Sequence, residues 1–186
     1  MSENASTEDY DVVLLIEQAL TQQDAAQVHS LHEGLEQPVT YHVLLPLEDA
    51  AARIESAMGS LTAGDMLASP TMPMSEVDLD AVRKDCEDRS DSELSQTLAA
   101  LRASGATARG QVVTDPPIDA LAAKLAEVDG REAIILTRPH VVSEFFHLDW
   151  TSKARRRLGV PILHLLEHET FDQQAEGYGE EGVTGL

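Results

Sequence analysis

The run Val12-Val13-Leu14-Leu15-Ile16 decides the fold of this chain. Five consecutive apolar residues leave no polar face, and this is typical of a central parallel strand that helices cover on both faces. Thr21, with Asp24 three residues later, then forms a helix-start signature, and Gly34 supplies a stop. We therefore expect residues 11–35 to form a strand and a helix that are integral to the fold.

The same alternation of short apolar runs and helix-periodic stretches continues along the chain. Further strands are expected at residues 41–46, 108–114, 133–137 and 160–166. Helices are expected near residues 50–61, 76–104, 115–130 and 150–158, with a long loop at 62–75 and Asp115 as a helix cap. This pattern predicts an α/β fold, namely a three-layer αβα, Rossmann-like domain with a five-stranded parallel sheet.

Two of the expected strands have the character of sheet edges. Polar residues alternate with apolar ones from Ala108 to Thr114, and Pro161 stands at the start of the last strand, where it cannot donate to a ladder. A right-handed crossover places the leading strand beside residues 41–46. We expect the strand order 108–114, 12–16, 41–46, 133–137, 160–166.

The chain is long enough for one domain, with 186 residues of which 42% are hydrophobic. Residues 1–9 are polar and lack periodicity, so we expect a disordered N-terminus. Residues 171–186 are rich in Gly and Glu, and we expect a flexible acidic C-terminal tail. The domain itself is expected to span residues 10–170.

The charge of the chain excludes two classes of partner. Lys and Arg number 13 against 33 Asp and Glu, which gives a formal net charge of −20. Such a chain repels nucleic acid and anionic membrane surfaces, so neither is expected as a partner. The single cysteine, Cys86, cannot form an internal disulfide, and the acidic N-terminus is unlike a signal peptide. We expect a cytoplasmic protein.

Residues 108–168 resemble the C-terminal half of the universal stress protein family. In that family a strand, a Gly-Asp-Pro helix start, a buried strand, a glycine-rich phosphate loop, a helix and a Pro-Val-Leu-Val strand follow in order. The corresponding words here are Thr114-Asp115-Pro116, Ala133 to Leu136, Thr137 to Asp149, and Val160-Pro161-Ile162-Leu163. Residues 43–48 are similar to the family's first strand and turn, which makes the leading strand and helix an extra pair that fills the place of the family's second strand.

The resemblance also implies where a nucleotide would bind. ATP-binding members carry Gly, two residues, Gly, nine residues, Gly and then Ser or Thr, and these positions are Thr137, His140, Trp150 and Thr151 here. Only the last of them keeps the family's residue type. Side chains at the other three fill space that phosphates need beside backbone amides, and Asp149 adds a competing charge. The resemblance thus implies a degenerate ATP site, and we expect no bound cofactor.

Ligands of open α/β sheets bind outside the carboxyl ends of strands where the strand order reverses. With the expected order, the turns after Pro46 and Leu136 meet there, so the candidate residues of this nucleotide crevice are Glu48, Thr137, Arg138, His140 and Thr151. Two interpretations remain open. In one, Arg138 pairs with Glu48 or Asp49 and closes the crevice; in the other, its guanidinium binds an anionic ligand.

No catalytic constellation or metal motif is present in the sequence. The histidines at 140, 147 and 168 lie near one sheet end but match no metal-ligand spacing, and His164 is expected to be a hydrogen-bonded core or interface residue. The basic cluster of Lys153 and residues 155–157 is interpreted as favourable charge at a helix C-terminus, with a docking patch as its alternative. We therefore expect no metal site and no enzyme activity.

Two functions are compatible with these observations. The first is a non-catalytic, universal stress protein-like regulatory or interaction module with an unknown protein partner. It would form a homodimer through the strand Val160–Leu166, because family members commonly pair there. The alternative is a small-ligand or nucleotide-binding protein, or an enzyme, that uses a rebuilt crevice around Arg138, His140 and Thr151.

Overall fold

The computed structural model describes residues 9–47, 79–137 and 158–166. Within these ranges the elements follow one another as β1 (Tyr10–Ile16), α1 (Gln22–Ser30), β2 (Val39–Pro46), α3 (Leu79–Ala103), β3 (Thr107–Val113), α4 (Pro117–Val128), β4 (Glu132–Thr137) and β5 (Ile162–Leu166). The expected strands are therefore all present, with bounds that differ by a residue or two.

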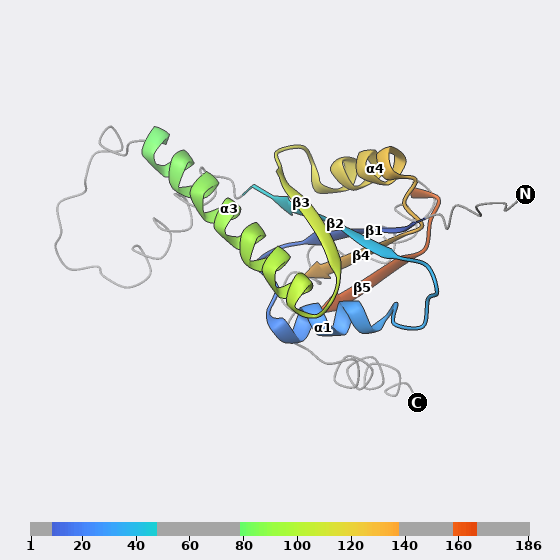
Figure 1. Ribbon diagram of the computed structural model, residues 1–186. Coiled ribbons are helices and arrows are strands. Elements are labelled where there is room, and N and C mark those ends of the chain that lie inside the picture. The colour runs from blue at the N-terminus through green and yellow to red at the C-terminus, as the bar shows by residue number, and fades with distance from the viewer. Residues whose placement is uncertain (1–8, 48–78, 138–157, 167–186) are drawn as a thin grey trace, which may run out of the picture.

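The five strands form one parallel sheet in the order β3-β2-β1-β4-β5. Helices α1 and α3 lie on one face of this sheet and α4 lies on the other (Figure 1). The expected α/β architecture, three layers around a five-stranded parallel sheet, is confirmed. Both strands that were expected at edges, β3 and β5, are edge strands.

The expected strand order is wrong at one point, because the first two strands exchange places. β1 lies in the centre, paired with β2 on one side and β4 on the other, and β3 pairs with β2. The leading strand β1 therefore does not lie between β3 and β2, as expected, but on the other side of β2. In the observed order β1, β2 and β3 lie side by side, and strands that are consecutive in the sequence are commonly neighbours in a sheet. The handedness of the crossover does not decide which of two equally apolar strands takes the central position.

β1 supplies side chains to both layers of the core. Val12, Leu14 and Ile16 are buried against α1 and α3, whereas Val13 and Leu15 are buried against α4. Because successive residues of a strand point to opposite faces, a strand with two covered faces has no place for an alternating polar residue. This arrangement explains why the apolar run in β1 is unbroken.

Two local expectations need correction. α1 ends at Ser30 rather than near Gly34, and Leu31 and Leu35, beyond its end, are 38% and 42% exposed. The N-cap of α4 is Pro116, with no side-chain cap, so Asp115 does not play that part. α3 runs without a break through its polar middle.

Several expectations fall on residues that lie outside the described ranges. These are the N-terminus, the helix at 50–61, the loop at 62–75, most of the helix near 150–158 and the acidic tail. In the part of the chain that is described, no helix has the length and apolar character needed to cross a membrane.

The central place of β1 predicts a large cost for a cavity there. Leu14 is fully buried, so Leu14→Ala should lower the free energy of unfolding by about 2–5 kcal/mol. Leu35→Ala removes the same atoms from a side chain that is 42% exposed, and this control should cost less than about 1 kcal/mol. Urea unfolding followed by circular dichroism measures both values. Equal losses would contradict the central position of β1.

Candidate functional site

The strand order places its reversal between β1 and β4. From β1 the chain continues to β2 on one side, and β4 lies on the other side with Leu136 in register with Ile16. The turns that meet at this carboxyl edge therefore follow Ile16 and Thr137. The expectation that the turn after Pro46 takes part is corrected, because β1 separates the end of β2 from the end of β4.

The turn after β1 leads into the N-terminus of α1, where a capping box binds the amides of Thr21 and Asp24. The Asp24 carboxylate accepts hydrogen bonds from the Thr21 amide at 3.0 Å and from the Thr21 hydroxyl at 2.6 Å. In return, the Asp24 amide donates to Thr21 Oγ1 at 3.2 Å. Asp24 is only 3% exposed, and the helix start predicted from the sequence is confirmed. A carboxylate of the chain itself thus lies at the positive end of α1.

The same turn is fixed to α3 by a buried hydrogen bond. The Leu20 amide donates to Thr97 Oγ1 at 3.0 Å, and the Thr97 side chain has no solvent exposure. This hydrogen bond satisfies a buried backbone donor that would otherwise be costly. The turn at the switch point is therefore held between a helix cap and a buried threonine.

Thr137 is the first position of the altered nucleotide motif, and it ends β4. Its Oγ1 lies 2.8 Å from Nε2 of His164 on the neighbouring strand β5, and both side chains are partly buried. The expectation that His164 is hydrogen-bonded is confirmed. Burial lowers the pKa of His164 below its usual value, which favours the neutral imidazole. The threonine side chain is thus directed to a neighbouring strand at a position where the motif requires glycine.

The other candidate residues of the crevice are not described. Glu48, Arg138, His140 and Thr151 lie outside the described ranges, as do Asp49, Asp149, Trp150, His147, His168 and the basic cluster at 153–157. Their roles stay predictions from the sequence. Among the residues that are described, no group of His, Cys, Asp and Glu side chains has the arrangement of a metal site.

A buried network at the amino ends of the strands was not found from the sequence. His32 Nε2 lies 2.7 Å from Glu132 Oε1, and its Nδ1 lies 2.7 Å from the Tyr41 hydroxyl. The Tyr10 hydroxyl donates to Glu132 Oε2 at 3.1 Å. The hydrogen bond from His32 lowers the pKa of Glu132, whereas burial, more than the charge of Glu132, raises the pKa of both tyrosines. This network connects the end of α1 to β1, β2 and β4.

A second histidine–carboxylate pair lies on the opposite face, below α4. His42 Nε2 is 2.5 Å from Asp11 Oδ1, and the two side chains are 7% and 18% exposed. Both residues belong to strands that are mostly apolar. An acidic residue in one buried strand and a histidine in the next are a usable signal, but the sequence alone does not supply the register that brings them together.

Comparison with known proteins adds a fold resemblance. No family model and no curated protein matches the sequence. A solved universal stress protein from Archaeoglobus fulgidus is 12% identical, with 83% of this chain and 92% of that chain covered at a TM-score of 0.49. The same organism's universal stress protein in complex with dAMP is 13% identical, with coverages of 84% and 98% and a TM-score of 0.45.

A universal stress protein family protein from Arabidopsis thaliana with AMP bound is 11% identical to this chain. The match covers 87% of this chain and 94% of that chain, with a TM-score of 0.48. The chain resembles the universal stress proteins. The sequence segments around β3, β4 and β5 are similar to the same family.

The burial of His164 predicts how stability depends on pH. Because its pKa is lowered in the folded protein, the unfolded chain takes up a proton first as the pH falls below about 6.5, and folding then loses free energy. His164→Gln removes this titration and keeps a side chain that can bond Thr137. Between pH 8 and pH 5 the variant should therefore lose less unfolding free energy than the wild type. Equal losses would show that His164 contributes nothing to the acid sensitivity.

Proposed function

We propose that this protein is a non-catalytic, universal stress protein-like regulatory or interaction module whose nucleotide crevice is degenerate. The observation that carries the proposal is the buried Asp24 carboxylate on the N-terminus of α1, at the reversal of strand order. Helix N-termini bind phosphates through free amides and a positive dipole end. Here the Asp24 carboxylate and the Thr21 hydroxyl accept hydrogen bonds from two amides at this helix start, those of Thr21 and Asp24.

Two further properties support the proposal. Thr137 has a side chain where the family's motif has its first glycine, and this side chain is hydrogen-bonded to His164 on β5. The formal net charge of −20 makes the approach of a polyphosphate unfavourable unless a local cluster of cations offsets it. Binding to the crevice would therefore require the chain to open its own contacts. A non-catalytic role follows as the simplest use of this fold.

The alternative function predicted from the sequence is tested by the same experiment. In that alternative, Arg138, His140 and Thr151 rebuild the crevice for a small ligand or a nucleotide. The solved relatives in complex with dAMP and AMP make adenine nucleotides the natural ligands to try.

ATP with magnesium should not stabilise this protein. A dissociation constant near 1 μM would, with about 5 mM nucleotide, raise the free energy of unfolding by about 5 kcal/mol, which is several degrees in melting temperature. We expect a shift of less than about one degree relative to a salt control of equal ionic strength. The same comparison with AMP tests a smaller ligand. A rise of several degrees with either nucleotide would favour the rebuilt crevice.

We further propose that the protein acts as a homodimer through β5. Its outer edge is unpaired by any described strand. The large hydrophobic side chains that are exposed in the described ranges, Leu31, Leu35 and Leu163, all line one shallow hollow of about 280 Å³ beside this edge. An unpaired strand edge and a cluster of exposed apolar side chains are both commonly buried at the interface with a partner subunit. A second copy of the chain, pairing β5 with β5, would cover both at once.

A charge in this hollow should separate the subunits. Leu163 is 38% exposed on β5, and Leu163→Asp places a carboxylate on the proposed contact without entering the core. Sedimentation at about 100 μM should give a dimer for the wild type and a monomer for this variant. Gln96→Asp, on the exposed side of α3, is the matched control and should stay dimeric. A wild-type protein that is monomeric throughout would refute the dimer.

A further inference from the structure

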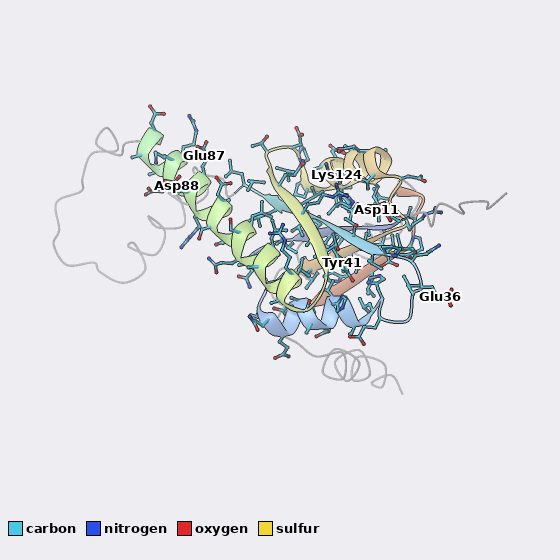
Figure 2. The ribbon with its side chains drawn as sticks, in the orientation of Figure 1. Asp11, Glu36, Tyr41, Glu87, Asp88 and Lys124 are labelled. Carbon is cyan, nitrogen blue, oxygen red and sulfur yellow. The ribbon has the colours of Figure 1, made fainter. Side chains whose placement is uncertain are left out.

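A polar hollow lies between α4 and the amino-terminal half of the sheet. Its volume is about 320 Å³, and its walls come from β1, β2, β3 and the last turns of α4, at Asp11, His42, Val43, Arg109, Gly110, Gln111, Lys124, Glu127 and Val128. Asp11 and Lys124 mark the two sides of this hollow in Figure 2. We call it the α4 hollow. It lies away from the nucleotide crevice, which is at the carboxyl ends of the strands.

The hollow exists because α4 does not extend over the edge strand. The helix packs against β1, β2 and β4, and Arg109 and Gln111 of β3 remain exposed on the same face as the buried Val113. Residues two apart in a strand share a face, so these two side chains stand beside the helix rather than beneath it. The result is a space with a polar edge and an open side.

His42 offers this space a ring nitrogen. Its Nε2 is 2.5 Å from the Asp11 carboxylate, which fixes a proton on Nε2 because a carboxylate only accepts. Its Nδ1 has no hydrogen bond among the described residues and is not sealed from solvent. In the neutral ring, Nδ1 accepts; in the imidazolium, Nδ1 donates while Nε2 continues to donate to Asp11.

The charged groups around His42 leave an excess of cations. Asp11 of β1 is paired with His42, and Glu127 of α4 accepts a hydrogen bond from Lys124 at 2.8 Å. The Arg109 guanidinium on β3 has no ion pair or side-chain hydrogen bond within the described ranges. With His42 protonated, the five ionisable side chains of the hollow therefore sum to one positive charge, within a chain whose formal charge is −20.

We propose that the α4 hollow binds a small oxyanion, such as a phosphate or carboxylate group, between the Arg109 guanidinium and Nδ1–H of protonated His42. A guanidinium matches two oxygens of such a group in one plane, and the imidazolium donates to another oxygen. Asp11 acts through His42, because its carboxylate accepts from Nε2 and leaves Nδ1 as the ring nitrogen that can meet the ligand. Lys124 remains paired with Glu127.

Sulfate is the first probe, because its charge stays constant between pH 5.5 and pH 8. Titration of the uniformly labelled protein at pH 6 should give saturable shifts of the His42 ring signals and of the β3 amides near Arg109. Arg109→Gln should weaken binding about tenfold or more, since a charge-assisted pair is lost. Arg83→Gln is the matched control, because Arg83 is an exposed arginine on α3 away from the hollow. Its affinity for sulfate should equal that of the wild type.

The pH dependence separates this site from nonspecific attraction to an arginine. Wild-type affinity should be higher at pH 6 than at pH 8, because Nδ1 of His42 donates only when the ring is an imidazolium. His42→Gln keeps a donor for Asp11 and should bind weakly at both pH values. If that variant does not fold, Arg109→Gln and the wild-type pH comparison suffice. Phosphate and acetate, titrated in turn, then distinguish a phosphate ligand from a carboxylate ligand.

Two outcomes would overturn the proposal. One is the absence of saturable shifts at His42 up to high millimolar sulfate, phosphate or acetate. The other is equal affinity of wild type, Arg109→Gln and Arg83→Gln for an anion that does bind, since that result would place the anion elsewhere.

Discussion

The pairing of β1 with both β2 and β4 is the contact on which the rest of this structure depends. It places the most apolar segment of the chain in the middle of the sheet, where side chains from α1, α3 and α4 cover it on both faces. Because the hydrogen bonds between parallel strands fix their register, the same pairing also decides which residues meet at each end of the sheet. The two ends of the sheet carry different polar side chains.

At the carboxyl ends, the pairing brings the turn after β1 beside the end of β4. Both positions are occupied by side chains of the chain itself: Asp24 caps α1, and Thr137 bonds to His164. At the amino ends, the same pairing brings each of two histidines beside a carboxylate, with one pair on each face of the sheet. Among the described residues, the two histidine–carboxylate pairs thus lie at the end of the sheet opposite the expected crevice, and the α4 hollow lies beside one of them.

The sequence predicts the layers of this fold well because each strand signal is local. The unbroken apolar run in β1 and the alternating pattern in β3 report how many faces are covered, and the capping box at Thr21 reports a helix start. The order of the strands is harder to predict from the sequence. β1 and β2 are both apolar and of similar length, so either could be the central strand, and only the strands that pair with each of them distinguish the two.

The amino-end clusters could not be predicted for a related reason. His32 and Glu132 are 100 residues apart, and His42 and Asp11 are 31 apart, so neither pair has a local spacing that a motif could record. Each pair appears only once the register of β1 with β2 and β4 is known. The crevice was predicted from the family's motif and from the reversal of strand order, and of its five candidates Thr137 is the one that lies in the described ranges.

We propose that this universal stress protein-like chain acts as a nucleotide-free homodimer. Native mass spectrometry of the protein, purified without added nucleotide and then mixed with ATP and magnesium, tests both parts in one measurement. We expect a species at twice 20.2 kDa that gains no nucleotide mass. A dimer that retains or takes up one adenine nucleotide per subunit, or a species that stays at the mass of one chain, would contradict it.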